Sequence, residues 1–192
     1  QGIQPAAQSL IVHPGRQAQD HPLVPVTGPG KALLEEPVLN GVERELAGQA
    51  ALLASVADRL LLAEEDVATG TRLREYGLDG TYRGRDIGAD LFKAQAEGMA
   101  LAQCADGTGY WIATDQFKDR SVFHVFDRLT LDYKGAFAGN RTANTDGVWL
   151  DQSADARFPQ GAFYAVDDDQ AVAAFDWRDI AKALSLPECR VE

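Results

Sequence analysis

Acidic and amide side chains recur in this sequence at a nearly constant spacing. Gln49, Glu97 and Asp146 each begin an apolar run, and they lie 48 and 49 residues apart. A second polar group ends the next apolar run of each copy: Glu64, Glu65 and Asp66; Asp115 and Gln116; and Asp167, Asp168 and Asp169. Oxygen ligands that converge from several segments suit Ca²⁺, which takes about six to eight carboxylate, amide and water oxygens. The recurrence predicts a calcium site, although an isolated acidic cluster is more often a solvated turn.

The apolar runs between these groups predict the strands that would position them. A third strand in each copy carries an aromatic residue, at Tyr76, Phe126 and Phe175, spaced 50 and 49 residues apart. The alanines just before the acidic groups are spaced 50 and 52 residues apart, at Ala63, Ala113 and Ala165. Four strands in about 50 residues, repeated, is typical of β-propeller blades. Equivalent positions of successive inner strands would then form a ring around one axis.

Turn signals support antiparallel hairpins rather than helices. Asp-Gly pairs at residues 79–80 and 106–107 separate apolar runs, and such pairs favour tight hairpin turns. A fourth strand is predicted at residues 81–84 and 132–135, whereas the third copy ends in a short helix. That helix is predicted from Trp177 to Leu184, with Asp176 as its N-cap.

The first 45 residues differ from the rest of the chain. They hold six of the eight prolines among short apolar runs at residues 9–13 and 32–34. Proline removes a donor from the strand ladder, so these runs suit short or edge strands. We therefore divide the chain into residues 1–45, which form edge strands or a partial blade, and residues 46–192, which form blades with a terminal helix.

Composition excludes several classes of partner. The chain has 18 Lys and Arg against 29 Asp and Glu, a net charge of −11, which argues against nucleic acid and anionic membranes. No apolar run is long enough to span a bilayer. Two cysteines leave either one disulfide or two buried thiols. No G-x-S-x-G motif is present, Cys104 has no assignable histidine partner, and the strand pattern favours a half-exposed or satisfied His124 over a catalytic one, so covalent catalysis is not indicated.

Six motifs in the chain resemble, in order and spacing, the C-terminal half of the β-propeller phytases. They are LAEEDV (62–67), AEGM (96–99), DGTGYWIATDQ (106–116), TDG (145–147), FPQGAF (158–163) and FDWRDIA (175–181). The resemblance runs from about Leu46 to Leu184. It implies an all-β fold made of about three blades of a six-bladed propeller, with a short C-terminal helix. It also implies hydrolysis of phytate, or another phosphomonoester, by a calcium-activated water.

The resemblance also assigns residues to the site. Glu64, Glu65, Glu97, Gln116 and Asp146 match positions that supply calcium ligands. Lys118, Arg120 and Arg141 follow candidate inner strands and are weaker candidates for phosphate binding, because basic loop residues usually only aid solubility.

Two departures from the family pattern favour an alternative function. Gln49 and Gln95 stand where the family has acidic residues, and fewer charges imply weaker calcium binding. Blades that carry many of the family's phosphate-contacting residues have no counterpart in the chain. The alternative is a non-catalytic or incomplete phytase-like propeller domain that serves as a binding or auxiliary module.

Three further expectations follow from the resemblance. Family members are exported, so the protein is expected to be secreted or periplasmic, where a Cys104–Cys189 disulfide can form. Three blades leave open β edges. A homodimer, or missing blades from the same protein, is therefore expected to cover them.

Overall fold

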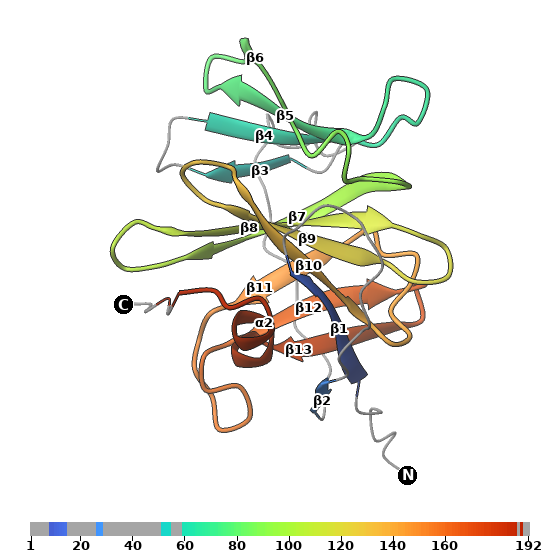
Figure 1. The fold of residues 1–192 in the computed structure, drawn as a ribbon, viewed down its shortest axis with the longest axis vertical. Coiled ribbons are helices and arrows are strands. Elements are labelled where there is room, and N and C mark those ends of the chain that lie inside the picture. The colour runs from blue at the N-terminus through green and yellow to red at the C-terminus, as the bar shows by residue number, and fades with distance from the viewer. Residues whose placement is uncertain (1–7, 15–25, 29–50, 55–58, 188, 190–192) are drawn as a thin grey trace.

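The computed structural model describes residues 8–14, 26–28, 51–54, 59–187 and 189, which form three antiparallel sheets and a short helix (Figure 1). The first sheet has the order β3-β4-β5-β6. Its strands are β3 (Ala51–Ala54), β4 (Arg59–Glu64), β5 (Arg72–Gly77) and β6 (Tyr82–Ile87). These four strands correspond to the first predicted copy.

The central sheet has the order β2-β1-β10-β9-β8-β7. The second copy supplies β7 (Gln95–Gln103), β8 (Gly109–Gln116), β9 (Val122–Asp127) and β10 (Tyr133–Gly139). The N-terminal segment adds β1 (Gln8–Pro14) and β2 (Val26–Gly28). The run at residues 9–13 is thus a strand, but β1 lies between β2 and β10, and β2 forms the edge. The predicted run at residues 32–34 lies outside the described residues.

The third sheet consists of β11 (Val148–Asp151), β12 (Ala162–Asp167) and β13 (Ala171–Asp176). The helix α2 (Trp177–Ala183) follows β13 directly. The Asp176 side chain accepts a hydrogen bond from the Arg178 backbone N–H, so the predicted N-cap is confirmed. The third copy thus ends in a helix in place of a fourth strand, as expected.

Strand pairing corrects the predicted alignment of the first copy by one residue. Met99 pairs with Ala113 and Val148 pairs with Ala165, but Ala51 pairs with Leu62 rather than with Ala63. The residue equivalent to Ala113 is therefore Leu62. Side chains alternate between the two faces of a strand, so a slip of one residue would exchange the buried and outer sets. Burial of Leu61 and Ala63 against the central sheet determines the register.

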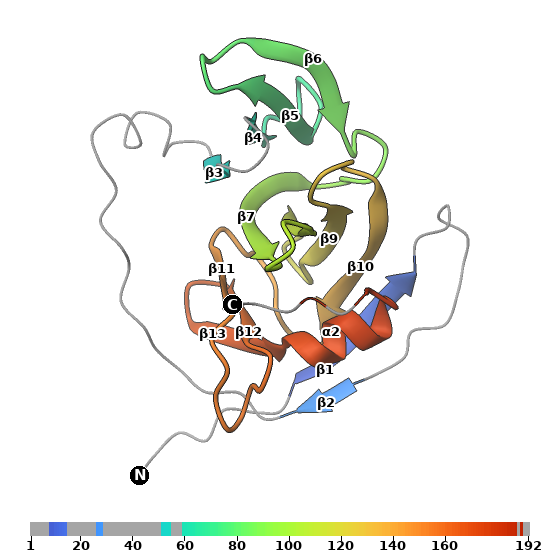
Figure 2. The same cartoon turned by 90° about the vertical axis from the view of Figure 1, so that its left-hand side faces the viewer.

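The three sheets pack face to face through two cores (Figure 2). We call the face of a sheet that points toward the next sheet along the chain its forward face, and the opposite face its backward face. The backward face of the central sheet, including Trp111, Ala113 and Phe126, packs against the first sheet. Its forward face packs against the third sheet and α2.

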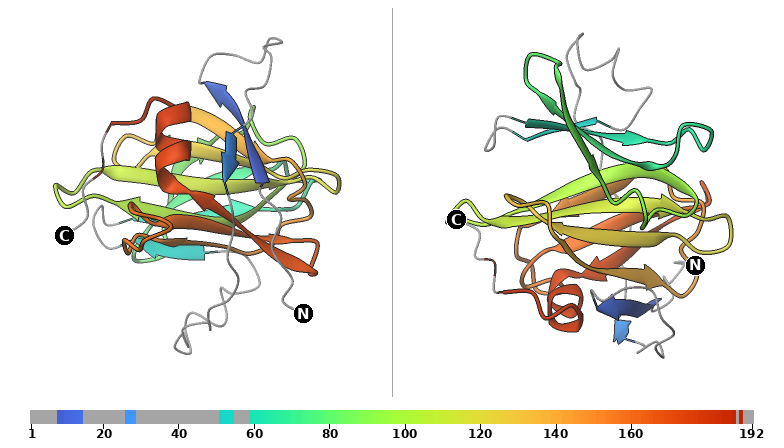
Figure 3. Two further views of the ribbon diagram at one scale, coloured as in Figure 1. Left: turned by 90° about the horizontal axis from the view of Figure 1, so that it is seen from below. Right: turned by 45° about the horizontal axis from the view of Figure 1, so that its top comes forward.

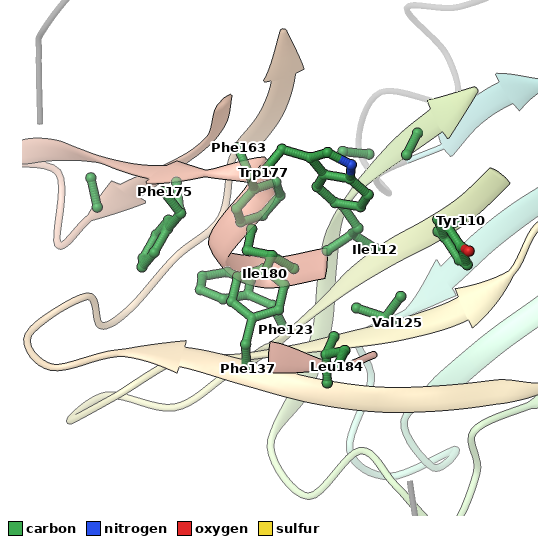
Figure 4. Close-up of a cluster of buried hydrophobic side chains, with 14 residues drawn as sticks. Tyr110, Ile112, Phe123, Val125, Phe137, Phe163, Phe175, Trp177, Ile180 and Leu184 are labelled. Carbon is green, nitrogen blue, oxygen red and sulfur yellow. The ribbon is translucent and has the colours of Figure 1, made fainter. Parts of the chain in front are cut away.

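Phenylalanine side chains fill the second of these cores (Figure 4). The ring of Phe123 lies 5.1 Å from that of Phe137, 5.0 Å from that of Phe163 and 6.0 Å from that of Phe175, measured between centroids. Ile180 of α2 is fully buried in the same cluster. The helix thus closes one end of the core between the central and third sheets.

The fold is all-β with one short helix, as predicted. The described segments form three sheets stacked face to face, and these three sheets do not close a ring (Figure 3). A disulfide joins Cys104, just before the turn between β7 and β8, to Cys189 beyond α2, with the two Cα atoms 5.0 Å apart. No helix of the described part of the chain is long and apolar enough to cross a membrane.

Candidate functional site

The inner strands of the central and third sheets hold Glu97 and Asp146 close together. The Gly98 N–H donates a hydrogen bond to the Asp146 carbonyl oxygen over 3.0 Å. A Cβ at position 98 would overlap that carbonyl, so only glycine allows this approach. The Glu-Gly and Asp-Gly pairs that the sequence placed at equivalent positions therefore meet directly.

Gln116 and Glu65 complete the group. Gln116 ends β8, and its side-chain amide donates a hydrogen bond to the Asp146 carboxylate. Glu65 follows β4, and its carboxyl group interacts with that of Glu97. The first, central and third sheets thus contribute one carboxylate each, namely Glu65, Glu97 and Asp146.

This convergence changes the acidity of Glu97. Burial, the hydrogen bond with Glu65, and repulsion from the Glu65 and Asp146 carboxylates raise the pKa of Glu97 from 4.5 to about 8. A hydrogen bond between two carboxyl groups requires a proton on one of them. At neutral pH that proton partly offsets the negative charge, which is the role a bound cation would take.

Glu64 lies outside this group, although the sequence analysis assigned it as a ligand. Its carboxylate pairs with the Arg74 guanidinium on the neighbouring strand β5 at 3.3 Å. The corrected register explains the difference, because Glu64 is equivalent to Asp115 and Glu65 is equivalent to Gln116. Of the two predicted glutamates, Glu65 is therefore the one that meets Glu97.

The three basic candidates lie in loops near Gln116 and Asp146. Lys118 and Arg120 are exposed between β8 and β9, and Arg141 is exposed after β10. Backbone hydrogen bonds join the two loops: Ser121 N–H to Thr142 C=O and Asn144 N–H to Phe117 C=O, each over 2.9 Å. The fold thus gathers these basic side chains at the same end of the central sheet as the acidic group.

Asp115 has a structural role that the sequence did not reveal. It is 1% exposed, and its carboxylate accepts hydrogen bonds from the backbone N–H groups of Lys93 and Ala94, both at 2.8 Å. At the equivalent place in the third sheet, Asp167 accepts a hydrogen bond from the Ala143 N–H over 3.0 Å. In the central and third sheets, the aspartate near the end of β8 or β12 thus fixes the backbone segment that leads into β7 or β11.

His124 is a buried strand residue, whereas the sequence pattern leaves a half-exposed or a satisfied strand histidine open. Its Nδ1 lies 3.2 Å from the Tyr133 hydroxyl, and its ring meets Phe92 edge-on. Burial raises the pKa of Tyr133 to about 12. His124 Nε2 lies 3.6 Å from the Asp115 carboxylate. These contacts are buried between the first and central sheets, so His124 is not placed to meet a substrate.

The donor set fits Ca²⁺ in kind, because it consists of carboxylate and amide oxygens. Among the described residues, however, no group of three or more His, Cys, Asp or Glu side chains is spaced to hold a metal ion. The acidic group therefore has the oxygen donors that calcium prefers, but its described residues do not form a complete set of metal ligands.

The fold and site together define an all-β repeat protein with an acidic group where its three sheets meet. No protein-family model matches the sequence, and no curated protein matches it at a significant level. The resemblance to β-propeller phytases rests on the six motifs.

Proposed function

We propose that this protein is a calcium-dependent phosphomonoester hydrolase that acts on phytate. The observation that carries the proposal is the convergence of Glu65, Glu97 and Asp146 from three successive sheets, together with the raised pKa of Glu97. Holding several carboxylates together at a partly buried place costs free energy unless a cation or a proton lies between them. An acidic group of this kind would by itself repel a polyphosphate substrate.

Bound calcium would remove this repulsion by neutralising the acidic group. Glu65, Glu97, Asp146 and the Gln116 side chain are the residues that would hold it. Bound Ca²⁺ supplies positive charge that attracts phosphate oxygens and activates water for attack on phosphorus. The side chains of Lys118, Arg120 and Arg141 would bind and orient further phosphate groups from the adjoining loops. Both cysteines are joined in the disulfide, in accord with a mechanism that needs no thiol nucleophile.

Export of the protein is part of the same proposal. A disulfide between Cys104 and Cys189 suits an oxidising compartment, such as the periplasm or the extracellular space.

The test is release of inorganic phosphate from calcium phytate near neutral pH, with and without a chelator. We expect chelation to abolish release. The substitutions Glu97→Gln and Asp146→Asn should lower kcat/KM on the order of a hundredfold or more, since they remove charge that holds the ion. Asp90→Asn is the matched control, because Asp90 is exposed in a loop.

The second candidate is a non-catalytic binding or auxiliary module of the same fold. It is favoured by the lack, in the described residues, of a closed set of metal ligands and by the pairing of Glu64 with Arg74. If chelation changes neither the melting temperature nor phosphate release, this module replaces the enzyme as the best account.

A further inference from the structure

Strand β7 contains a β-bulge at the residue that supplies its carboxylate to the acidic group. The pairing with β8 shifts by one residue after Ala96, so Glu97 and Gly98 together lie opposite Thr114. Ala96 and Met99 are therefore both buried in the core with the first sheet, although residues three apart in a regular strand point to opposite faces. A bulge re-aims the side chains at its position. The direction of the Glu97 side chain thus depends on this bulge.

The bulge is kept in place because β7 is fixed on both sides of it. After the bulge, residues 99–103 pair regularly with β8 up to the turn that joins the two strands. Before the bulge, the Asp115 carboxylate accepts hydrogen bonds from the N–H groups of Lys93 and Ala94, both over 2.8 Å. If the start of β7 slipped to a regular register, Glu97 would point to the backward face, into the core with the first sheet. The two bonds to Asp115 oppose that slip.

The Asp115 carboxylate is well suited to fix the backbone. It is 1% exposed, and a hydrogen bond to an ionised acceptor is stronger away from water. One of its oxygens accepts the Lys93 N–H and the other accepts the Ala94 N–H. His124 Nε2 lies beyond hydrogen-bond distance, at 3.6 Å. Both carboxylate oxygens therefore act on the start of β7.

The third sheet repeats this arrangement. Asp167, at the end of β12, accepts a hydrogen bond from the Ala143 N–H over 3.0 Å. Ala143 precedes Asp146 by three residues, just as Ala94 precedes Glu97 by three. In both sheets an aspartate therefore holds the backbone three residues before the acid that joins the acidic group.

The first copy differs in both respects. Its sequence has Gln49 where the other two copies have an acid. Its residue equivalent to Asp115 is Glu64, whose carboxylate pairs with Arg74 at 3.3 Å. The fixing aspartate thus accompanies the inner-strand acid in the two copies that have one.

We propose that Asp115 is a positioning residue for Glu97. It fixes the start of β7, and the bulge then carries the Glu97 carboxyl group to those of Glu65 and Asp146. For calcium binding, this inference rests on the proposed function, whereas the position of the bulge can be measured without the ion.

Amide hydrogen exchange at Gly98 tests the position of the bulge in metal-free protein. The Gly98 N–H donates to the Asp146 carbonyl oxygen over 3.0 Å, and local opening of such a bond speeds exchange. Asp115→Ala removes both acceptors of the start of β7. We expect it to lower the protection of the Gly98 amide on the order of tenfold or more relative to that of the Ile112 amide in the middle of β8. Asp115→Asn keeps one acceptor oxygen and should give a smaller loss.

Asp127→Ala is the matched control. Asp127 ends β9 and also accepts two backbone hydrogen bonds, from the Leu129 N–H over 2.9 Å and from the Thr130 N–H over 3.0 Å. These bonds lie at the end of β9 that is distant from the acidic group. The control should lower the melting temperature and leave the protection of Gly98 relative to Ile112 unchanged. Far-ultraviolet circular dichroism checks the fold, and Asp115→Asn carries the comparison if Asp115→Ala does not fold.

Calorimetric titration with Ca²⁺ tests the consequence for the site. Asp115→Ala should weaken binding on the order of tenfold or more, Asp115→Asn should weaken it less, and Asp127→Ala should leave it unchanged. An effect of charge alone would make the two Asp115 variants equal and would overturn the proposal.

The two measurements separate the positioning role from the proposed function. If the wild type binds no Ca²⁺ but Gly98 exchanges faster in Asp115→Ala, the proposed function fails and the positioning role stands. Unchanged protection of Gly98 in Asp115→Ala, or an equal loss in Asp127→Ala, would overturn the positioning role. Equally tight Ca²⁺ binding by the wild type and Asp115→Ala would overturn it as well.

Discussion

Glu65 and Glu97 interact through their carboxyl groups although they belong to different sheets, and a hydrogen bond with Glu65 is one cause of the raised pKa of Glu97. Such a bond needs a proton on one of the two carboxyl groups, so this contact between two sheets depends on pH. Asp146 of the third sheet adds to the repulsion that raises the pKa of Glu97 to about 8.

This linkage predicts how stability depends on pH when calcium is absent. A carboxyl group whose pKa is raised from 4.5 to about 8 binds its proton more tightly in the folded state than in the unfolded state. Its contribution to stability is fully present below about pH 4.5 and is lost as pH rises through about 8. With a chelator present, the melting temperature of the wild type should therefore fall between pH 5 and pH 9.

Glu97→Gln should flatten that part of the profile, because the amide does not titrate. Calcium should raise the wild-type melting temperature most at high pH, where Glu97 is ionised and free to bind the ion. The melting temperatures of the wild type and Glu97→Gln are measured by thermal unfolding between pH 5 and pH 9. If both fall equally steeply with pH, Glu97 does not control the pH dependence.

Glu75 is expected to be a major contributor to stability. It is buried, and its carboxylate lies 3.5 Å from Arg59, 3.6 Å from Arg83 and 3.9 Å from Arg85. Glu75→Gln removes the charge that balances these guanidinium groups and should lower the free energy of unfolding by about 3 kcal/mol. Urea denaturation measures the change, with Asp90→Asn as the control. A loss below about 0.5 kcal/mol would contradict this role.

The disulfide should contribute more to the free energy of unfolding than its position near the end of the chain suggests. Its cysteines are 85 residues apart, and loop-closure entropy gives an upper bound of about 4–5 kcal/mol for a loop of that size. The Cys104→Ser, Cys189→Ser double variant should therefore unfold at a clearly lower urea concentration. Thiol titration of the unreduced native protein should find no free cysteine. Two titrating thiols would refute the bond.

The sequence by itself determined the strands of the three copies, their repetition and the helix, but not the place of β1 and β2 in the central sheet. Alternating apolar residues, Asp-Gly turns and the Asp176 cap act over a few neighbouring residues, so they can be read from the chain directly. The recurrence of Glu97 and Asp146 at the start of equivalent apolar runs likewise indicated that the two would lie close together.

Only the tertiary structure decided which acids gather and which do not. Glu65 rather than Glu64 meets Glu97, because the pairing of Leu62 with Ala51 sets the register of β4 and a slip of one residue reverses its faces. Asp115 belongs to one of the recurring polar groups, yet its side chain is buried and accepts two backbone hydrogen bonds from the segment before β7, so its role is structural. The raised pKa of Glu97 arises from burial and from charges on other sheets, and neither is encoded in the residues next to it.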